Sequence, residues 1–155
     1  MALTITSPLT TYDNCDSITG WNNPGDGIDA TEMIEGAGCH ASDVDVETET
    51  MIGPTISSIN MSTTKYAIYP WILGFTAAYL DLKSNGGLFV ILGDGTNESY
   101  WYVGGRDSYS GGWEVLVANT DASPDGNSGS AANLAAITQI GFGFKGVTKS
   151  KLADN

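Results

Sequence analysis

The densest group of side chains suited to binding lies in the segment YWYVGGRDSY, residues 100–109. On a strand, Tyr100 and Tyr102 share one face, while Trp101 and Val103 share the opposite face. Flat aromatic rings can stack on the C–H faces of sugars, and nearby charged side chains can hold the hydroxyl groups. The candidate residues for binding a glycan or a protein partner are therefore Tyr100, Tyr102, Arg106, Asp107 and Tyr109.

A purely structural interpretation of the same segment stays open. In it, Trp101 and Val103 belong to the core, and the tyrosines are ordinary cross-strand neighbours. Arg106 is the only arginine in the chain. It is therefore the one guanidinium available for fixing a ligand.

Three carboxylates alternate along the segment Asp43-Val-Asp45-Val-Glu47. The pattern resembles the Glu-x-Asp-x-Glu strand of laminarinase-like glycosidases, where two glutamates act as nucleophile and general acid/base about 5–5.5 Å apart. Here the first position is aspartate, and the expected aromatic surroundings are missing. A solvated acidic strand that discourages edge pairing is the favoured interpretation. We expect no catalytic residues and no enzymatic activity.

Metal binding has weak support in the sequence. His40 is the only histidine in the sequence. One histidine beside one cysteine does not supply the four ligands of a zinc site, and no pattern around a nucleophile predicts a catalytic triad. Calcium needs six to eight oxygen ligands, and no loop supplies a complete series. The acidic loops are better explained as turns, although one structural calcium stays open. These loops contain Asp13 with Asp16, Asp26 with Asp29, Asp94 with Asn97 and Glu98, and Asp121 with Asp125.

The charge balance excludes two classes of partner. The 155 residues include 18 acidic and 6 basic side chains, for a net charge of −12. Nucleic acids and anionic membranes both require cationic side chains, so neither is an expected partner. No apolar run approaches the roughly 20 residues of a membrane span, and residues 1–10 lack the features of a signal peptide. We therefore expect synthesis in the cytoplasm without export by that route.

Cys15 and Cys39 are the only cysteines. In a reducing cytoplasm, two buried free thiols are the favoured state. A disulfide between them remains the alternative, and it would stabilise the fold by roughly 3 kcal/mol in the chain-entropy model.

Short apolar runs separated by Gly, Asn, Asp and Pro predict an all-β domain. The run at 88–92 is continuously apolar, as in a strand covered on both faces. The one helical candidate, 131–136, predicts only a helical turn or a loop. The expected strands are 3–6, one within 38–52, one within 66–82 that Pro70 and Gly74 interrupt, 88–92, 99–104, 113–118 and 137–144.

Two of these strands have distinctive faces. Trp113, Val115 and Val117 form one apolar row, and apolar residues alternate with glycine over 140–144. Such glycines permit a bulge or the close approach of another backbone. The spacing of the strands predicts one domain over 1–155, an antiparallel two-sheet β-sandwich of jelly-roll type. Because the sequence stops soon after its last strand, we expect it to be the N-terminal part of a longer chain.

The order of scaffold motifs resembles a known group of domains. These motifs are DNCDSITGW at 13–21, Glu-Gly-Ala-Gly at 35–38, the aromatic strand around Trp71, Gly-Gly-Trp at 111–113 and Leu-x-x-Ile-x-x-Ile-x-Phe at 134–142. They resemble the jelly-roll modules grouped with concanavalin A-like lectins and carbohydrate-binding modules, which also occur in bacteriophage tail, fibre and head-decoration proteins. Such motifs specify the scaffold, not the ligand.

The resemblance implies a virion protein assembled in the host cytoplasm. Its expected protein partners are other virion proteins or further copies of the chain, since phage fibres and decorations are commonly homotrimers. Host-surface glycans are the other expected partners. A free-standing carbohydrate-binding module is the alternative. A lectin-fold glycoside hydrolase using Asp43, Asp45 and Glu47 is the remote one.

Overall fold

The computed structural model describes residues 17–22, 27–29, 39–41, 48–63, 66–72, 80–108 and 114–147. These residues form nine strands and two short 3-10 helices: β1 (Gly27–Asp29), β2 (Cys39–Ala41), β3 (Thr48–Ile52), β4 (Tyr66–Ile72), η2 (Lys83–Asn85), β5 (Leu88–Gly93), β6 (Glu98–Gly104), β7 (Glu114–Asn119), β8 (Gly126–Ser128), η3 (Leu134–Ala136) and β9 (Gln139–Lys145). Within the described ranges, no helix has the length and apolar character needed to cross a membrane.

Five strands form one antiparallel sheet in the order β3-β9-β5-β6-β8. β5 is the middle strand, and all six of its residues are buried. This is the covering on both faces that the continuous apolar run predicts. β1 pairs with β2, and β4 with β7, as two separate antiparallel ribbons.

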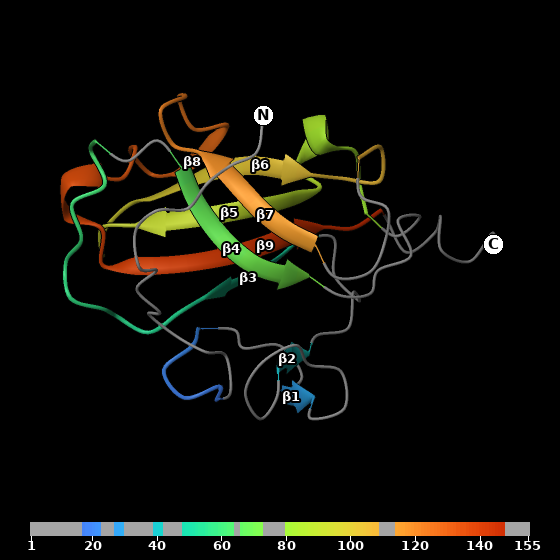
Figure 1. Cartoon of the computed structure of the whole chain (residues 1–155), viewed down its shortest axis with the longest axis horizontal. Coiled ribbons are helices and arrows are strands. Elements are labelled where there is room, and N and C mark those ends of the chain that lie inside the picture. The colour runs from blue at the N-terminus through green and yellow to red at the C-terminus, as the bar shows by residue number, and fades with distance from the viewer. Residues whose placement is uncertain are drawn as a thin grey trace.

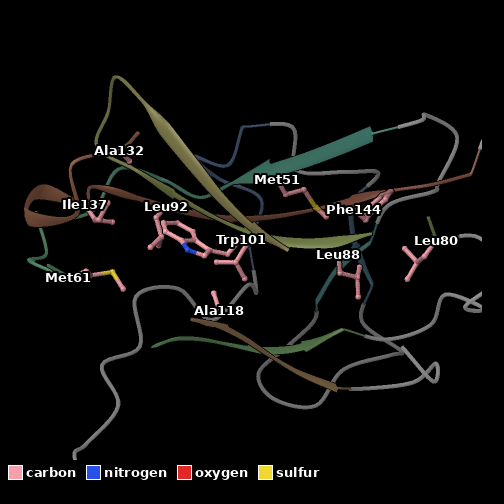
Figure 2. Packing of buried hydrophobic residues seen from close by; sticks show 11 residues of the cluster. Met51, Met61, Leu80, Leu88, Leu92, Trp101, Ala118, Ala132, Ile137 and Phe144 are labelled. Atoms are coloured by element: carbon pink, nitrogen blue, oxygen red, sulfur yellow. The ribbon is translucent and has the colours of Figure 1, made fainter. Parts of the chain in front are cut away.

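One face of the sheet, the core face, carries the larger hydrophobic cluster. Alternate residues of β5 contribute Leu88, Val90 and Leu92, which are fully buried. The neighbouring strands add Trp101 and Phe144. The β4–β7 ribbon crosses in front of this face (Figure 1). The side chains of the cluster fill the space between the sheet and the ribbon (Figure 2). The β4–β7 ribbon therefore packs on the core face of the five-stranded sheet.

The ribbon turns one side of β7 toward the sheet. Ala118 is 1% exposed and belongs to the core cluster, whereas Val117 is 44% exposed. Of the predicted apolar row of residues 113, 115 and 117, Val117 therefore has its side chain on the outer side of the ribbon. In β4, the register shifts between Tyr69 and Ile72, around Pro70. Proline has no N–H to donate to a ladder, so an irregularity at this position is expected.

The β-rich fold agrees with the expectation from sequence. Among the described residues there is almost no helix, and the predicted helical turn near 131–136 is the single 3-10 turn of η3. The glycines of β9 allow the predicted close approach, because a Cβ at Gly141 would collide with the Met51 carbonyl oxygen of β3. The expected strand at 3–6 lies outside the described residues.

The packing of the ribbon on the sheet is tested by two adjacent substitutions. We expect Ala118→Leu to lower the free energy of unfolding by about 1–3 kcal/mol, because the larger side chain overpacks the layer between β7 and the sheet. Val117→Leu, on the outer side of the same strand, should change it by less than about 0.5 kcal/mol. Urea unfolding followed by circular dichroism measures both. Equal tolerance of the two changes would contradict the inward orientation of Ala118.

Candidate functional site

The opposite side of the sheet, the tyrosine face, carries a smaller and more polar cluster. It consists of Ile52, Phe89 and Ile91, with the half-buried rings of Tyr100 and Tyr102 packed against them. Trp101 faces the other way, is 4% exposed and donates its indole N–H to the Ala122 carbonyl at 3.1 Å. The alternation of β6 is thus the predicted one, with Trp101 in the core and the two tyrosines together on the other face.

Phe89 sets the orientation of both tyrosine rings. Its centroid lies 5.7 Å from that of Tyr100 at an interplanar angle of 69° and 6.3 Å from that of Tyr102 at 64°. Such edge-to-face pairs are favourable because of the ring quadrupoles. Gly126 of β8 lies beside the same rings, since a Cβ there would be 3.4 Å from Tyr100 Cδ2 and 3.8 Å from the Tyr102 hydroxyl oxygen. The rings are therefore fixed by contacts within the sheet.

A loop carboxylate fastens β8 next to these tyrosines. The Tyr102 N–H donates to Asp125 Oδ2 at 2.7 Å, and the Asp125 N–H donates to the Tyr100 carbonyl at 2.8 Å. The two bonds hold the start of β8 in register with the middle of β6. Asp125, one of the residues considered for calcium, thus acts as a hydrogen-bond acceptor for the backbone.

The hydroxyl of Tyr100 forms a short hydrogen bond on this face. It donates to Glu98 Oε2 at 2.7 Å. Burial, together with the hydrogen bond and negative charge of Glu98, raises the pKa of Tyr100 to about 12, against a smaller opposing effect of a hydrogen bond with the Ser128 side chain. Tyr100 therefore stays protonated and keeps the Glu98 carboxylate in a fixed position.

The sheet register places further polar residues next to Glu98. Gly93 of β5 pairs with Gln139 on one side and with Glu98 on the other, and Glu98 pairs with Ser128. Residues paired in register share a face of the sheet, so Gln139, Glu98 and Ser128 form one polar row beside Tyr100. In the described part of the chain, Glu98 Oε1, the Gln139 amide and the Tyr102 hydroxyl have no hydrogen-bond partner. Within the described ranges, these are the groups of the face to which a ligand could form hydrogen bonds.

Arg106 and Asp107 lie beyond the end of β6, in an exposed turn. The Arg106 N–H donates to the Asp81 carbonyl at 3.1 Å, and Asp107 Oδ1 accepts from the Lys83 N–H at 3.0 Å. Gly105 permits this docking, because a Cβ there would overlap Lys83 N. The turn thus adjoins the Tyr102 end of β6, away from the polar row, and Tyr109 lies outside the described residues.

The carboxylate of Asp81 interacts with positive charges near this turn. Burial alone would raise the pKa of its carboxyl, but hydrogen bonds from Leu82 and Asn85 and the charges of Lys145 and Arg106 hold it below the usual value. The guanidinium of Arg106, which the sequence predicts as a ligand-binding group, therefore interacts electrostatically with the Asp81 carboxylate.

The loop between β5 and β6 is organised by Asp94, another residue considered for calcium. Its Oδ1 accepts from the N–H groups of Thr96 at 2.9 Å and Asn97 at 2.8 Å, and its Oδ2 accepts from the Asn133 N–H at 2.8 Å. These bonds, that from Asn133 first, lower the pKa of Asp94 to about 2. Its oxygens are occupied by N–H donors, as the turn interpretation predicts.

Several other candidate residues are not among those that the structure describes. Asp43, Asp45 and Glu47 lie outside the described residues, as do Cys15, Asp13, Asp16 and Asp26. Within the described ranges, no three His, Cys, Asp or Glu side chains are grouped so as to hold a metal ion. The free-thiol and calcium expectations stay predictions.

Sequence reasoning did not assign Glu98, Gln139 or Ser128 to this face, and considered Glu98 only in an acidic loop. They are separated by up to 41 positions in the chain and meet only through the pairing of β8, β6, β5 and β9. The one available signal was the alternation of β6, which places Glu98 on the face of Tyr100 and Tyr102.

Comparisons of the chain with protein-family models, with curated protein sequences and with solved structures gave no match in any of the three.

Acid titration tests the role of Asp94. Since the pKa of Asp94 is lowered from 3.8 to about 2, its contribution to stability is present above about pH 4 and is lost as the pH falls toward 2. We expect the Asn133 amide proton, followed by NMR, to shift with a midpoint near the lower value. In Asp94→Asn this titration should disappear, and loop 129–133 should exchange its amide protons faster. A midpoint near 3.8 in the wild type would contradict the hydrogen-bonded arrangement.

Proposed function

We propose that the chain is a non-enzymatic structural or adhesion module of a phage virion, in a fibre, a tail or a capsid decoration, and that it binds glycans through the tyrosine face. We further propose that the five-stranded sheet and the β4–β7 ribbon are parts of a jelly-roll sandwich. The scaffold motifs at 13–21, 35–38, 71, 111–113 and 134–142 support the virion setting by their resemblance to such modules. The β-rich, layered fold is compatible with it.

The observation that carries glycan binding is the composition of the tyrosine face. Two half-buried tyrosines, fixed by Phe89, lie beside a row of polar side chains that retain unused hydrogen-bonding groups. Sugars present apolar C–H faces and hydroxyl groups together, so a rigid aromatic surface with adjacent acceptors suits them. Because the rings are already oriented, little conformational entropy is lost on binding.

A free-standing carbohydrate-binding module is the alternative function, and the same face supports it. The two differ in assembly, because a virion module binds other particle proteins or copies of itself, whereas a free module needs no such contact. Both act without catalysis.

Assembly distinguishes the two functions. We expect the full-length native product to be a homotrimer or to be bound to particles, because fibre and decoration modules act in repeated arrays. Multi-angle light scattering gives its mass, and negative-stain microscopy gives its shape and location. A compact monomer absent from particles would contradict the virion proposal and favour the free-standing module.

Substitutions on the tyrosine face test glycan binding. We expect Tyr100→Ala and Tyr102→Ala each to weaken binding by about tenfold or more, since removal of a central aromatic contact costs more than 1 kcal/mol. A glycan array identifies a ligand, and calorimetry then compares the variants. Val117→Ala, on the outer side of the ribbon, is the control and should bind as the wild type does. Circular dichroism verifies that each variant is folded. Unchanged affinity in both tyrosine variants would refute the site.

A further inference from the structure

The described positive charges gather at one end of the five-stranded sheet. Of the six basic residues of the chain, the structure describes Lys83, Arg106 and Lys145. Lys145 ends β9, and Arg106 follows the end of β6. Lys83 lies in η2, and its backbone N–H donates a hydrogen bond to Asp107, the neighbour of Arg106 in the chain. Asp81 lies within the field of both Lys145 and Arg106.

The polar row lies at the other end. Glu98 begins β6 and Gln139 begins β9, so each is separated from the basic end by the length of its strand. Seven residues of strand span about 20 Å. That distance exceeds the Debye length of about 8 Å at physiological ionic strength, so the basic side chains are screened from Glu98. Glu98 is the charged side chain within the row itself, and the nearby carboxylates of Asp94 and Asp125 add to the negative potential.

We infer that the tyrosine face selects uncharged carbohydrate and disfavours sugars that carry a carboxylate. The inference rests on the proposed glycan binding and adds the chemical class of the ligand. Its basis is the position of the Glu98 carboxylate. One carboxylate oxygen accepts a hydrogen bond from the Tyr100 hydroxyl, and the other has no partner among the described residues.

The groups of the row match the hydroxyls of a neutral sugar. Glu98 Oε1 can accept from a hydroxyl, and charge-assisted hydrogen bonds of this kind are the stronger ones. The Gln139 amide can donate and accept, and the Tyr102 hydroxyl can do both. A carboxylate on the ligand would instead meet the fixed charge of Glu98, with no cation of the described set close enough to offset it.

Matched ligands that differ by one charge test this selectivity. The probes are oligogalacturonides with free carboxylates and the same oligomers as methyl esters, together with sialylated and unsialylated lactose. Binding is measured by calorimetry at low and physiological salt. We expect each neutral member that binds to do so about tenfold more tightly than its acidic counterpart, and the difference to shrink as salt is added.

Glu98→Gln should bring the two affinities close together, because the amide keeps the shape of the side chain and removes its charge. Asp121→Asn removes one negative charge from an exposed turn and is the matched control, which should leave the ratio unchanged.

Acidic probes that bind as tightly as the neutral ones, with binding still lost in Tyr100→Ala, would overturn the selectivity while supporting the glycan site. If neither kind binds on these probes or on an array, or if the tyrosine variants bind normally, the proposed site fails and the selectivity fails with it.

Discussion

The burial of β5 on both of its faces is the constraint on which the rest of the structure depends. Its six consecutive buried residues lie in the middle of the five-stranded sheet. A strand without a polar side must be covered above and below, since exposed apolar surface costs about 25 cal/mol per Å². The core face meets this requirement with Trp101, Phe144 and the β4–β7 ribbon. The tyrosine face meets it differently, with aromatic rings that still carry hydroxyl groups.

That difference follows from the neighbours of β5. On the core face, β9 contributes Phe142 and Phe144, whereas on the tyrosine face the paired positions are Gly141 and Gly143. Glycine covers nothing, so the large side chains that cover β5 there come from β6 and, across Gly141, from Ile52 of β3. Tyr100 and Tyr102 fill this role, and Phe89 orients both of them. The glycines of β9 thus allow β3 to approach closely and leave the cover of this face to side chains of the neighbouring strands.

The strands of the sheet could be predicted from the sequence, whereas the polar row beside Tyr100 could not. Strand periodicity located β5, β6, β7 and β9 to within a residue or two, because strong alternation or continuous apolar runs mark them. The pairing order and the β4–β7 ribbon could not be predicted, since they depend on contacts distant in sequence. The site prediction grouped Tyr100 with Arg106 because they are close in the chain. Along a strand, however, residues six positions apart are separated by about 20 Å, so close neighbours in the sequence can lie at opposite ends of a sheet.

The true neighbours of Tyr100 are set by register: Glu98 on its own strand, Gly126 across to β8, and Ile91 across to β5. A hydroxyl directed at a carboxylate, and rings held edge-on by Phe89, give a surface whose shape is determined before any partner arrives. The same contacts that seal β5 therefore also fix the donors and acceptors that a ligand would meet. Packing and recognition are coupled here, so the stability of this face and its choice of ligand depend on the same few side chains.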